Sequence, residues 1–530
     1  MFLAAVYAFG YDRLMQTRFV QLAMVLAVAI VAPLACAQDF VSRVNAMYAD
    51  IPAAKRSDTI LIPALAALDS PPASVRDLEP ARLIVPEMQS WKDALDWAMK
   101  PAQRAALEAL AKATAPQASP PPMVWGQGYG VAAVTPALVK SRLYTELGDP
   151  PLLAGAQFLY LSKLTELNIL ANIEATRLQA EGKVNEAIAL MGRVLVLGRQ
   201  IADRQFFREA RWGLETMISS LERVRDIAYL DFRSKRLLTR DQILGFIKSL
   251  DDKGEVRVDR ILFPKGDLVG AEQAVAIVMT PKGGVNERTF PTTMATLTSS
   301  EQPLRLFSEA AQWKSAGTGH ADWYATNEEV KKLSDDYSKR WPLEWFHTLN
   351  SLPFERDKLD PTMFAVLSAT VPQMSELFNL RQAVRTEIVG TRAALAIVGS
   401  FYARKTFPPK LSSIAPEWME RLDIDPFNPQ LQNANRPPLE YFVPMRDQVV
   451  DAKSEPQPHE MTIIGDNGSN FSIMLKDDTA VIYSVGADNR KGWAKRVQNT
   501  VEKAPDVDYL IWPSELSLYR QHLSESGELK

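Results

Sequence analysis

Cysteine is almost absent from this chain of 530 residues. The one cysteine, Cys36, lies near the N-terminus in an apolar segment. A chain cut after Ala37 contains no thiol at all. A protein without thiols cannot form disulfides, use a cysteine nucleophile or bind a metal through thiolates. Those chemistries are therefore excluded for a chain that has been cut there.

Signatures of catalysis are also scarce. The chain has four histidines, and none lies in an HExxH motif or beside another histidine at the spacing of metal ligands. There is no GxSxG segment, no serine followed three places later by lysine, and no phosphate-binding loop. A Ser-His-Asp triad assembled from distant residues stays open. These absences favour a protein that is not an enzyme.

The chain has no excess of charge of either sign. It carries 60 Lys and Arg against 63 Asp and Glu, a net charge of −3. Such a balance gives no electrostatic reason to expect a nucleic-acid partner. Glycine is sparse, at 25 residues, and proline is more frequent, at 35, which favours helices interrupted by proline-marked loops. The length predicts two or three domains.

The first 37 residues have the pattern of a secretory signal peptide. Arg18 precedes an uncharged apolar run, Phe19–Leu34, and the small residues in Ala35–Ala37 fit a cleavage site. A signal seldom contains two apolar blocks, so the apolar stretch before Met15 indicates that the true start is Met15. We expect export to the periplasm, with a mature chain that begins at Gln38.

Two other fates of this segment stay open. An uncleaved apolar run would anchor the protein in the inner membrane, and Cys36 is an alternative site for lipid attachment. Nothing after Ala37 resembles a second membrane span. We therefore expect no span to remain once the signal has been removed.

The middle of the chain is predicted to be mostly helical. Residues 38–122 form a helical segment that ends in a proline-rich linker, and residues 123–379 form a helical domain. The strongest pattern there is a helical hairpin joined at Glu181-Gly182-Lys183. The spacing of Gly182 and Ala187 resembles one tetratricopeptide-like hairpin, although no second copy follows at the expected period. Thr239 is a predicted N-cap.

Two groups of side chains in this helical region invite interpretation. The segment Arg204–Arg225 mixes both charges at helical spacing, which is typical of a helix that continues with a solvated face. The region from Leu304 to Leu380 is dense in aromatic residues, which predicts core packing. The alternative is that three of the rings contact a protein or polymer partner, namely Trp323, Trp341 and Trp345.

The last third of the chain has the most specific pattern. A helix-like run, Leu380–Pro408, precedes the turn sequence Asp425-Pro426-Phe427-Asn428, and strand-like runs follow that end in Thr479–Asp488, TAVIYSVGAD. This order resembles the globular part of the major pseudopilin of type II secretion systems. Residues 380–515 are therefore expected to form an α+β domain, one helix on a small antiparallel sheet, with residues 516–530 as a tail. Because several hundred residues separate this domain from the N-terminal apolar run, the chain is not expected to be a filament subunit.

The pseudopilin resemblance implies a calcium site in the loop after the last YSVGAD-type strand. The matching positions, together with later oxygen donors, are Asp488, Asn489, Asp506 and Asp508. Calcium needs six to eight oxygen ligands, and the basic residues at positions 490, 491 and 495 would oppose a cation. A salt-bridged turn is the alternative.

A signal, a helical domain and a pseudopilin-like domain, in that order, resemble a group of exported bacterial proteins, but the resemblance carries no activity with it. We expect a non-catalytic scaffold or binding protein of the bacterial cell envelope, with a protein or polymer partner. The alternative is a periplasmic hydrolase that acts on a glycan or peptide, with its site in the helical region near Trp323–Trp345.

Overall fold

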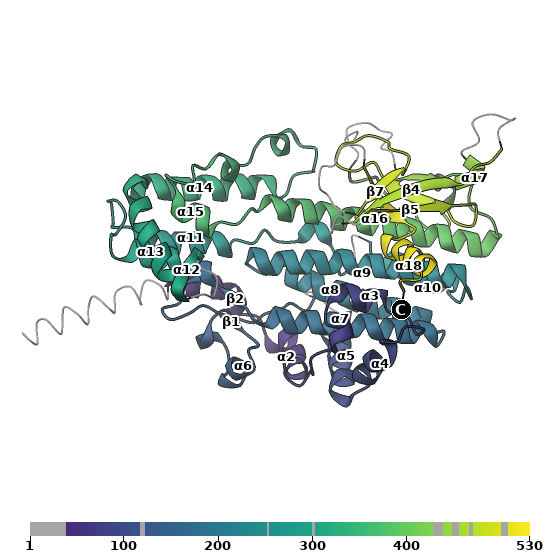
Figure 1. The fold of residues 1–530 in the computed structure, drawn as a ribbon, viewed down its shortest axis with the longest axis horizontal. Coiled ribbons are helices and arrows are strands. Elements are labelled where there is room, and N and C mark those ends of the chain that lie inside the picture. The colour runs from purple at the N-terminus through teal and green to yellow at the C-terminus, as the bar shows by residue number, and fades with distance from the viewer. Residues whose placement is uncertain are drawn as a thin grey trace, which may run out of the picture.

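The computed structural model describes residues 39–116, 122–251, 254–298, 303–427, 438–447, 455–465, 470–499 and 507–529. The predicted signal peptide and Asp506 lie outside these ranges. The protein is mostly helical, with 58% helix and 8% strand, and its main sheet lies near the C-terminal end of the chain (Figure 1). A mostly α fold followed by a small α+β region is therefore confirmed.

Residues 39–49 are helical. The helices up to residue 251 are α2 (Asp58–Ala66), α3 (Leu78–Leu83), α4 (Trp91–Ala98), α5 (Pro101–Ala113), α6 (Pro136–Lys140), α7 (Tyr160–Ala180), α8 (Val184–Ala202), α9 (Phe207–Arg233) and α10 (Arg240–Ser249). Those after it are α11 (Gly266–Val278), α12 (Thr289–Thr298), α13 (Pro303–Ala316), α14 (Trp323–Arg340), α15 (Ala365–Thr370), α16 (Ser375–Arg404), α17 (Pro444–Asp447) and α18 (Glu515–Ser526).

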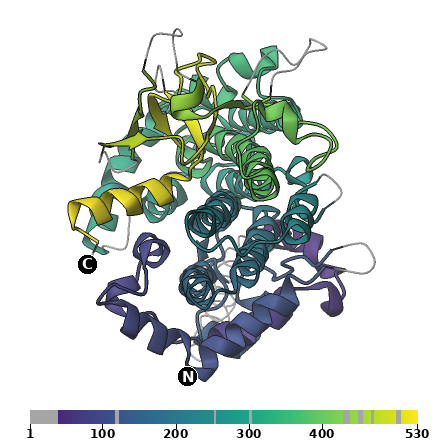
Figure 2. The same cartoon turned by 90° about the vertical axis from the view of Figure 1, so that its right-hand side faces the viewer.

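The predicted hairpin is formed by α7 and α8. Gly182 ends α7 with a φ of +79°, a left-handed conformation that suits glycine at the end of a helix. The predicted N-cap is also present, because the side chain of Thr239 accepts a hydrogen bond from the backbone N–H of Gln242 and forms a capping box with it. Figure 2 looks along the long helices and shows them stacked side by side.

The expectation for Arg204–Arg225 is wrong about the helix and holds for only part of the charged residues. The preceding helix ends at Ala202 and α9 begins afresh at Phe207. In the first half of α9 the side chains of Arg211 and Glu215 are each 47% exposed, whereas further along the helix those of Arg223 and Arg225 are each only 1% exposed. The physical reason is that α9 is enclosed by α8, α16 and α18, so opposite charges on these elements pair inside the protein.

The main sheet has six strands in the order β3-β6-β8-β7-β4-β5. The strands are β3 (Glu440–Phe442), β4 (His459–Ile464), β5 (Asn470–Leu475), β6 (Val481–Ser484), β7 (Arg496–Gln498) and β8 (Asp508–Trp512). The sheet was expected to be antiparallel, but it is mixed. The strand β7 lies between β4 and β8 and runs parallel to both. Two further short strands, β1 (Thr145–Glu146) and β2 (Gln157–Phe158), pair with each other near the start of α7.

The helix α16 joins the sheet to the helical layers. It begins at Ser375, before the predicted domain boundary at residue 380, and continues through it. Its glycine Gly390 faces the sheet so closely that a Cβ there would lie 2.5 Å from Cδ1 of Ile511 in β8. On another side, the hydroxyl of Tyr402 donates to Asp231 of α9 at 2.9 Å. The helix α16 thus contacts α9 as well as the sheet.

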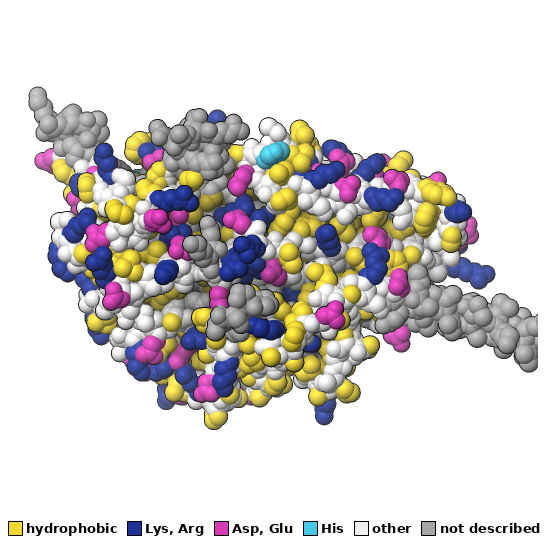
Figure 3. Space-filling view, turned by 180° about the vertical axis from the view of Figure 1, so that it is seen from behind, with side chains coloured by type: hydrophobic (Ala, Val, Ile, Leu, Met, Phe, Trp, Pro, Cys, Tyr) yellow, Lys and Arg dark blue, Asp and Glu magenta, His cyan; other side chains and the backbone are white. Residues whose placement is uncertain are grey.

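Charged side chains of both signs occur on the described part of the face opposite that of Figure 1. Figure 3 shows basic and acidic side chains mixed with hydrophobic ones across that face. Within the described ranges, no helix is both long enough and apolar enough to cross a membrane.

Candidate functional site

One cavity has a volume of about 1350 Å³. Its lining comes from the N-terminal ends of α7 and α9, the C-terminal ends of α12 and α15, and β2. Four segments far apart in sequence supply most of the lining: residues 153–159, 206–208, 296–298 and 368–373. We call it the α9 cavity.

The first turn of α9 forms part of the wall, together with Asp267 of α11. The Oδ2 of Asp267 accepts a hydrogen bond of 2.6 Å from the backbone N–H of Phe207. Burial raises the pKa of Asp267 to about 7, the Phe207 hydrogen bond opposes that rise, and the charge of Glu209 adds to it. This carboxyl therefore changes between its neutral and charged forms near neutral pH.

A buried polar cluster lies directly behind this wall. The guanidinium of Arg204 is held between the rings of Tyr48 and Tyr129, at 4.3 and 4.4 Å from their centroids. Glu209 accepts hydrogen bonds from Arg204, from Tyr129 at 2.7 Å and from Tyr160. Burial raises the pKa of Tyr129 and that of Tyr160 well above the ordinary value, which keeps both hydroxyls protonated as donors. These contacts fix the first turn of α9, and the carboxylate of Glu209 is occupied by hydrogen bonds within the cluster.

The charge of the lining is unbalanced. Among the described residues that line it, four are basic, Arg142, Lys163, Arg208 and Arg356, and one, Asp267, carries a carboxyl. Serine, threonine and glutamine side chains make up much of the remaining polar surface. This combination can orient a polar or acidic ligand, and it lacks the pair of carboxylates that glycoside hydrolysis generally requires.

Asp508 lies in β8, where it organises the preceding turn. Its Oδ1 accepts from the backbone N–H of Gly492 at 3.0 Å, and its Oδ2 accepts from that of Ala494 at 2.7 Å. Burial raises the pKa of Asp508 to about 6. At the other end of this turn, Asp488 accepts from the backbone N–H of Arg490 at 3.0 Å.

The expected salt-bridged turn has a counterpart here, since Lys491 lies 2.7 Å from a carboxylate oxygen of Glu440. Asn489, in the same turn, has a φ of +56°. In the described part of the chain, no group of three or more His, Cys, Asp or Glu residues is arranged to hold a metal ion. Calcium binding by these residues stays a prediction.

The three tryptophans considered as partner contacts differ in how deeply they are buried. Trp341 is 7% exposed, and its indole N–H donates to the carbonyl of Ile261 at 2.8 Å. Trp345 is half-buried and packs edge-on against Phe427, with ring centroids 5.9 Å apart. Trp323 is half-buried at the start of α14. Trp341 is thus a core residue, and partner contact through the other two rings stays a prediction.

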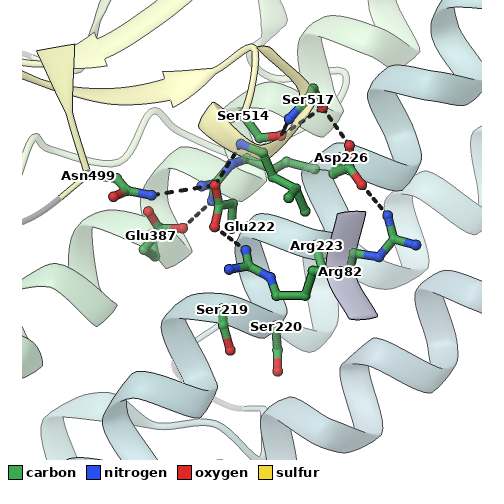
Figure 4. Close-up of polar contacts among 12 residues, drawn as sticks. Arg82, Ser219, Ser220, Glu222, Arg223, Asp226, Glu387, Asn499, Ser514 and Ser517 are labelled. Atoms are coloured by element: carbon green, nitrogen blue, oxygen red, sulfur yellow. Dashed lines mark hydrogen bonds and ion pairs between the residues drawn. The ribbon is translucent and has the colours of Figure 1, made fainter. Parts of the chain in front are cut away.

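A second group of ionisable side chains is buried further along α9 (Figure 4). The carboxylate of Asp226 pairs with Arg223 on the same helix and with Arg520 of α18 at 2.6 Å, and accepts from the hydroxyl of Ser517 at 2.7 Å. Both of its oxygens are therefore occupied. A buried carboxylate whose oxygens are all hydrogen-bonded stabilises the packing of the elements it connects, and it is not a reactive group.

Ion pairs also connect α9 to α3 and to α16. Glu222 pairs with Arg82 of α3, and Arg225 pairs with Glu387 of α16. Glu387 also accepts a 2.9 Å hydrogen bond from the hydroxyl of Tyr509 in β8. Burial raises the pKa of Glu387, and Arg225 opposes that rise. Charge pairing along α9 thus holds the helical layers and the sheet together.

The sequence alone does not point to Asp267 or to the basic residues of the cavity. The one local signal is an aspartate in the first turn of an apolar helix, a placement that is common and carries no functional information. Comparisons with protein-family models, with curated proteins and with solved structures find no match for this chain. Its function therefore has to be inferred from the α9 cavity.

Proposed function

We propose that this protein is an exported, non-catalytic binding protein of the bacterial cell envelope, and that it binds its ligand in the α9 cavity. The observation that carries the proposal is the cavity of about 1350 Å³ with four basic side chains and a single carboxyl in its lining. Sites of this kind hold ligands by shape and by a few polar groups.

Features of the sequence support both the envelope location and the binding role. The apolar run Phe19–Leu34 with its cleavage pattern supports export. The likeness of residues 380–515 to the globular part of a pseudopilin, and the tetratricopeptide-like turn between α7 and α8, support a role in binding or assembly. Neither likeness brings a reaction with it.

A periplasmic hydrolase is the second candidate, and Asp267 is the observation that favours it. A carboxyl with a pKa of about 7 that faces a cavity suits a general base that takes a proton from water. The Asp267→Asn variant separates the two candidates, because asparagine keeps an acceptor for the Phe207 N–H and cannot act as a base. A binding protein keeps its ligand affinity in this variant, whereas a hydrolase loses turnover.

The test of the proposed function is native mass spectrometry on the protein recovered from the periplasmic fraction of cells that express the full chain. We expect a mature protein that begins at Gln38 and carries a bound small molecule. Gly155 lines the cavity, and a Cβ added there meets nothing closer than 3.8 Å, so Gly155→Trp fills open space and should exclude the ligand.

Gly284 provides the matched control. It lies outside the cavity lining, and an added Cβ there has no neighbour within 4 Å, so Gly284→Trp should keep the ligand. Equal ligand retention in the two variants, or a protein that stays in the cytoplasm with its N-terminus intact, would overturn the proposed function.

A further inference from the structure

We infer that the ligand of the α9 cavity is anionic and is recognised through carboxylate or phosphate oxygens. The inference rests on the proposed function and specifies its ligand. Its basis is the arrangement of the four basic side chains. Two of them are bonded to neighbouring groups of the protein, and the other two are exposed at the cavity.

Lys163 and Arg356 belong to the walls. The ammonium of Lys163 lies 2.6 Å from Glu166 on the same helix, which offsets its charge. The guanidinium of Arg356 donates to the carbonyls of Ser368 and Val371 at 2.9 and 3.1 Å, at the end of α15. Arg356 keeps its positive charge, because carbonyl oxygens accept its hydrogen bonds without neutralising it.

Arg142 and Arg208 are exposed at the cavity. Among the described residues, neither forms an ion pair. Arg208 lies in the first turn of α9, where its charge lowers the pKa of Asp267. Arg142 has a φ of +57°, so its backbone is held in a left-handed turn beside the lining residue Ser141.

The guanidinium group suits the proposed ligand chemistry. It is always charged and offers parallel donors that match the two oxygens of a carboxylate or phosphate. Lys163 is offset by Glu166, and the three lining guanidiniums form no ion pair within the described part of the chain. The one carboxyl among the described lining residues is Asp267, which is partly protonated near neutral pH. A neutral ligand would leave these charges without a counterpart.

The size of the cavity favours a ligand larger than a single ion. Small-molecule sites commonly occupy about 300–1,000 Å³, and the α9 cavity exceeds that range. Gln157 and Ser368 line it as well, and their polar side chains suit a ligand that is polar along its length. A short acidic oligomer meets both conditions.

The test is calorimetric titration of the mature full-length protein with tetragalacturonic acid, with its neutral methyl ester and with inorganic phosphate. We expect the acid to bind at least about tenfold more tightly than the ester, with an affinity that falls as salt rises. Phosphate serves to distinguish the two oxygen sources, since binding of phosphate at equal or higher affinity assigns the site to phosphate-bearing ligands.

Two variants assign the binding to the cavity. Arg208→Glu is expected to weaken binding of the acid by about tenfold or more, because it replaces an attractive charge with a repulsive one. Lys235→Glu makes the same charge change at an exposed residue outside the cavity lining and should leave binding unchanged. Arg208→Gln guards against a folding defect, since it removes the charge without adding one.

The anion inference fails if acid and ester bind equally, if neither anion binds, or if Arg208→Glu and Lys235→Glu behave alike. Those results leave the proposed function intact when native mass spectrometry still finds a neutral ligand that Gly155→Trp excludes. Failure of the proposed function is the separate outcome in which Gly155→Trp excludes nothing.

Discussion

At the scale of single residues, Asp226 shows how the interior depends on charge pairing. It accepts from Arg223 and Arg520, both of which are buried. Helical spacing of mixed charges ordinarily indicates a solvated face. The sequence cannot reveal that the partner of Arg225 is Glu387, 162 residues further along the chain. The buried network was therefore beyond prediction from local pattern.

Substitution of Asp226 by alanine should destabilise the protein strongly. It would leave the guanidiniums of Arg223 and Arg520 buried without their counter-charge, a change that costs about 3–5 kcal/mol. Asp478→Ala removes the partner of Arg233 from an exposed ion pair and should cost less than about 1 kcal/mol. Urea unfolding of both variants measures the difference, and similar losses in the two would contradict a structural role for Asp226.

At the scale of elements, periodicity and turn chemistry predicted much of the fold. The hairpin of α7 and α8, the cap at Thr239 and the strand β6 all lie where the sequence places them. Proline also separates helices as expected, because Pro101 begins α5 shortly after α4 ends at Ala98. The parallel strand β7 was missed because its three residues carry no clear alternation and depend on β4 and β8 for pairing.

The contact between α8 and α9 depends on glycine. A Cβ built on Gly213 would lie 2.4 Å from the backbone N of Ala202 and 2.6 Å from the carbonyl O of Gly198. These are backbone atoms and cannot move aside, so Gly213→Ala should cost about 1–3 kcal/mol through overpacking.

Gly245 is the matched control for this contact. It lies exposed inside α10, with nothing within 4 Å of an added Cβ. Gly245→Ala should therefore stabilise the protein by about 0.5–1 kcal/mol, because alanine favours helix. Thermal unfolding of both variants gives the comparison, and shifts of the same sign would show that helix packing does not require the glycine.

At the scale of the whole molecule, the α9 cavity is built from segments that lie far apart in the sequence. Residues 153–159 and 368–373 meet there only because α9, α11 and α15 bring them together. No single segment has a recognisable motif, which is why neither Asp267 nor Arg208 could be identified from the sequence. The mostly helical class and the C-terminal sheet follow from local patterns, whereas the candidate site follows from tertiary packing.

The α9 cavity is proposed as the ligand-binding site of this protein. Hydrogen exchange followed by mass spectrometry, with and without saturating tetragalacturonic acid, shows which segments the ligand contacts. We expect slower exchange in residues 153–159 and 368–373 and at the start of α9, because ligand contact restricts local opening. Exchange in α14 and in the strands β3, β4 and β5 should be unchanged. Protection confined to α14 or to the sheet, or no protection anywhere, would contradict the claim.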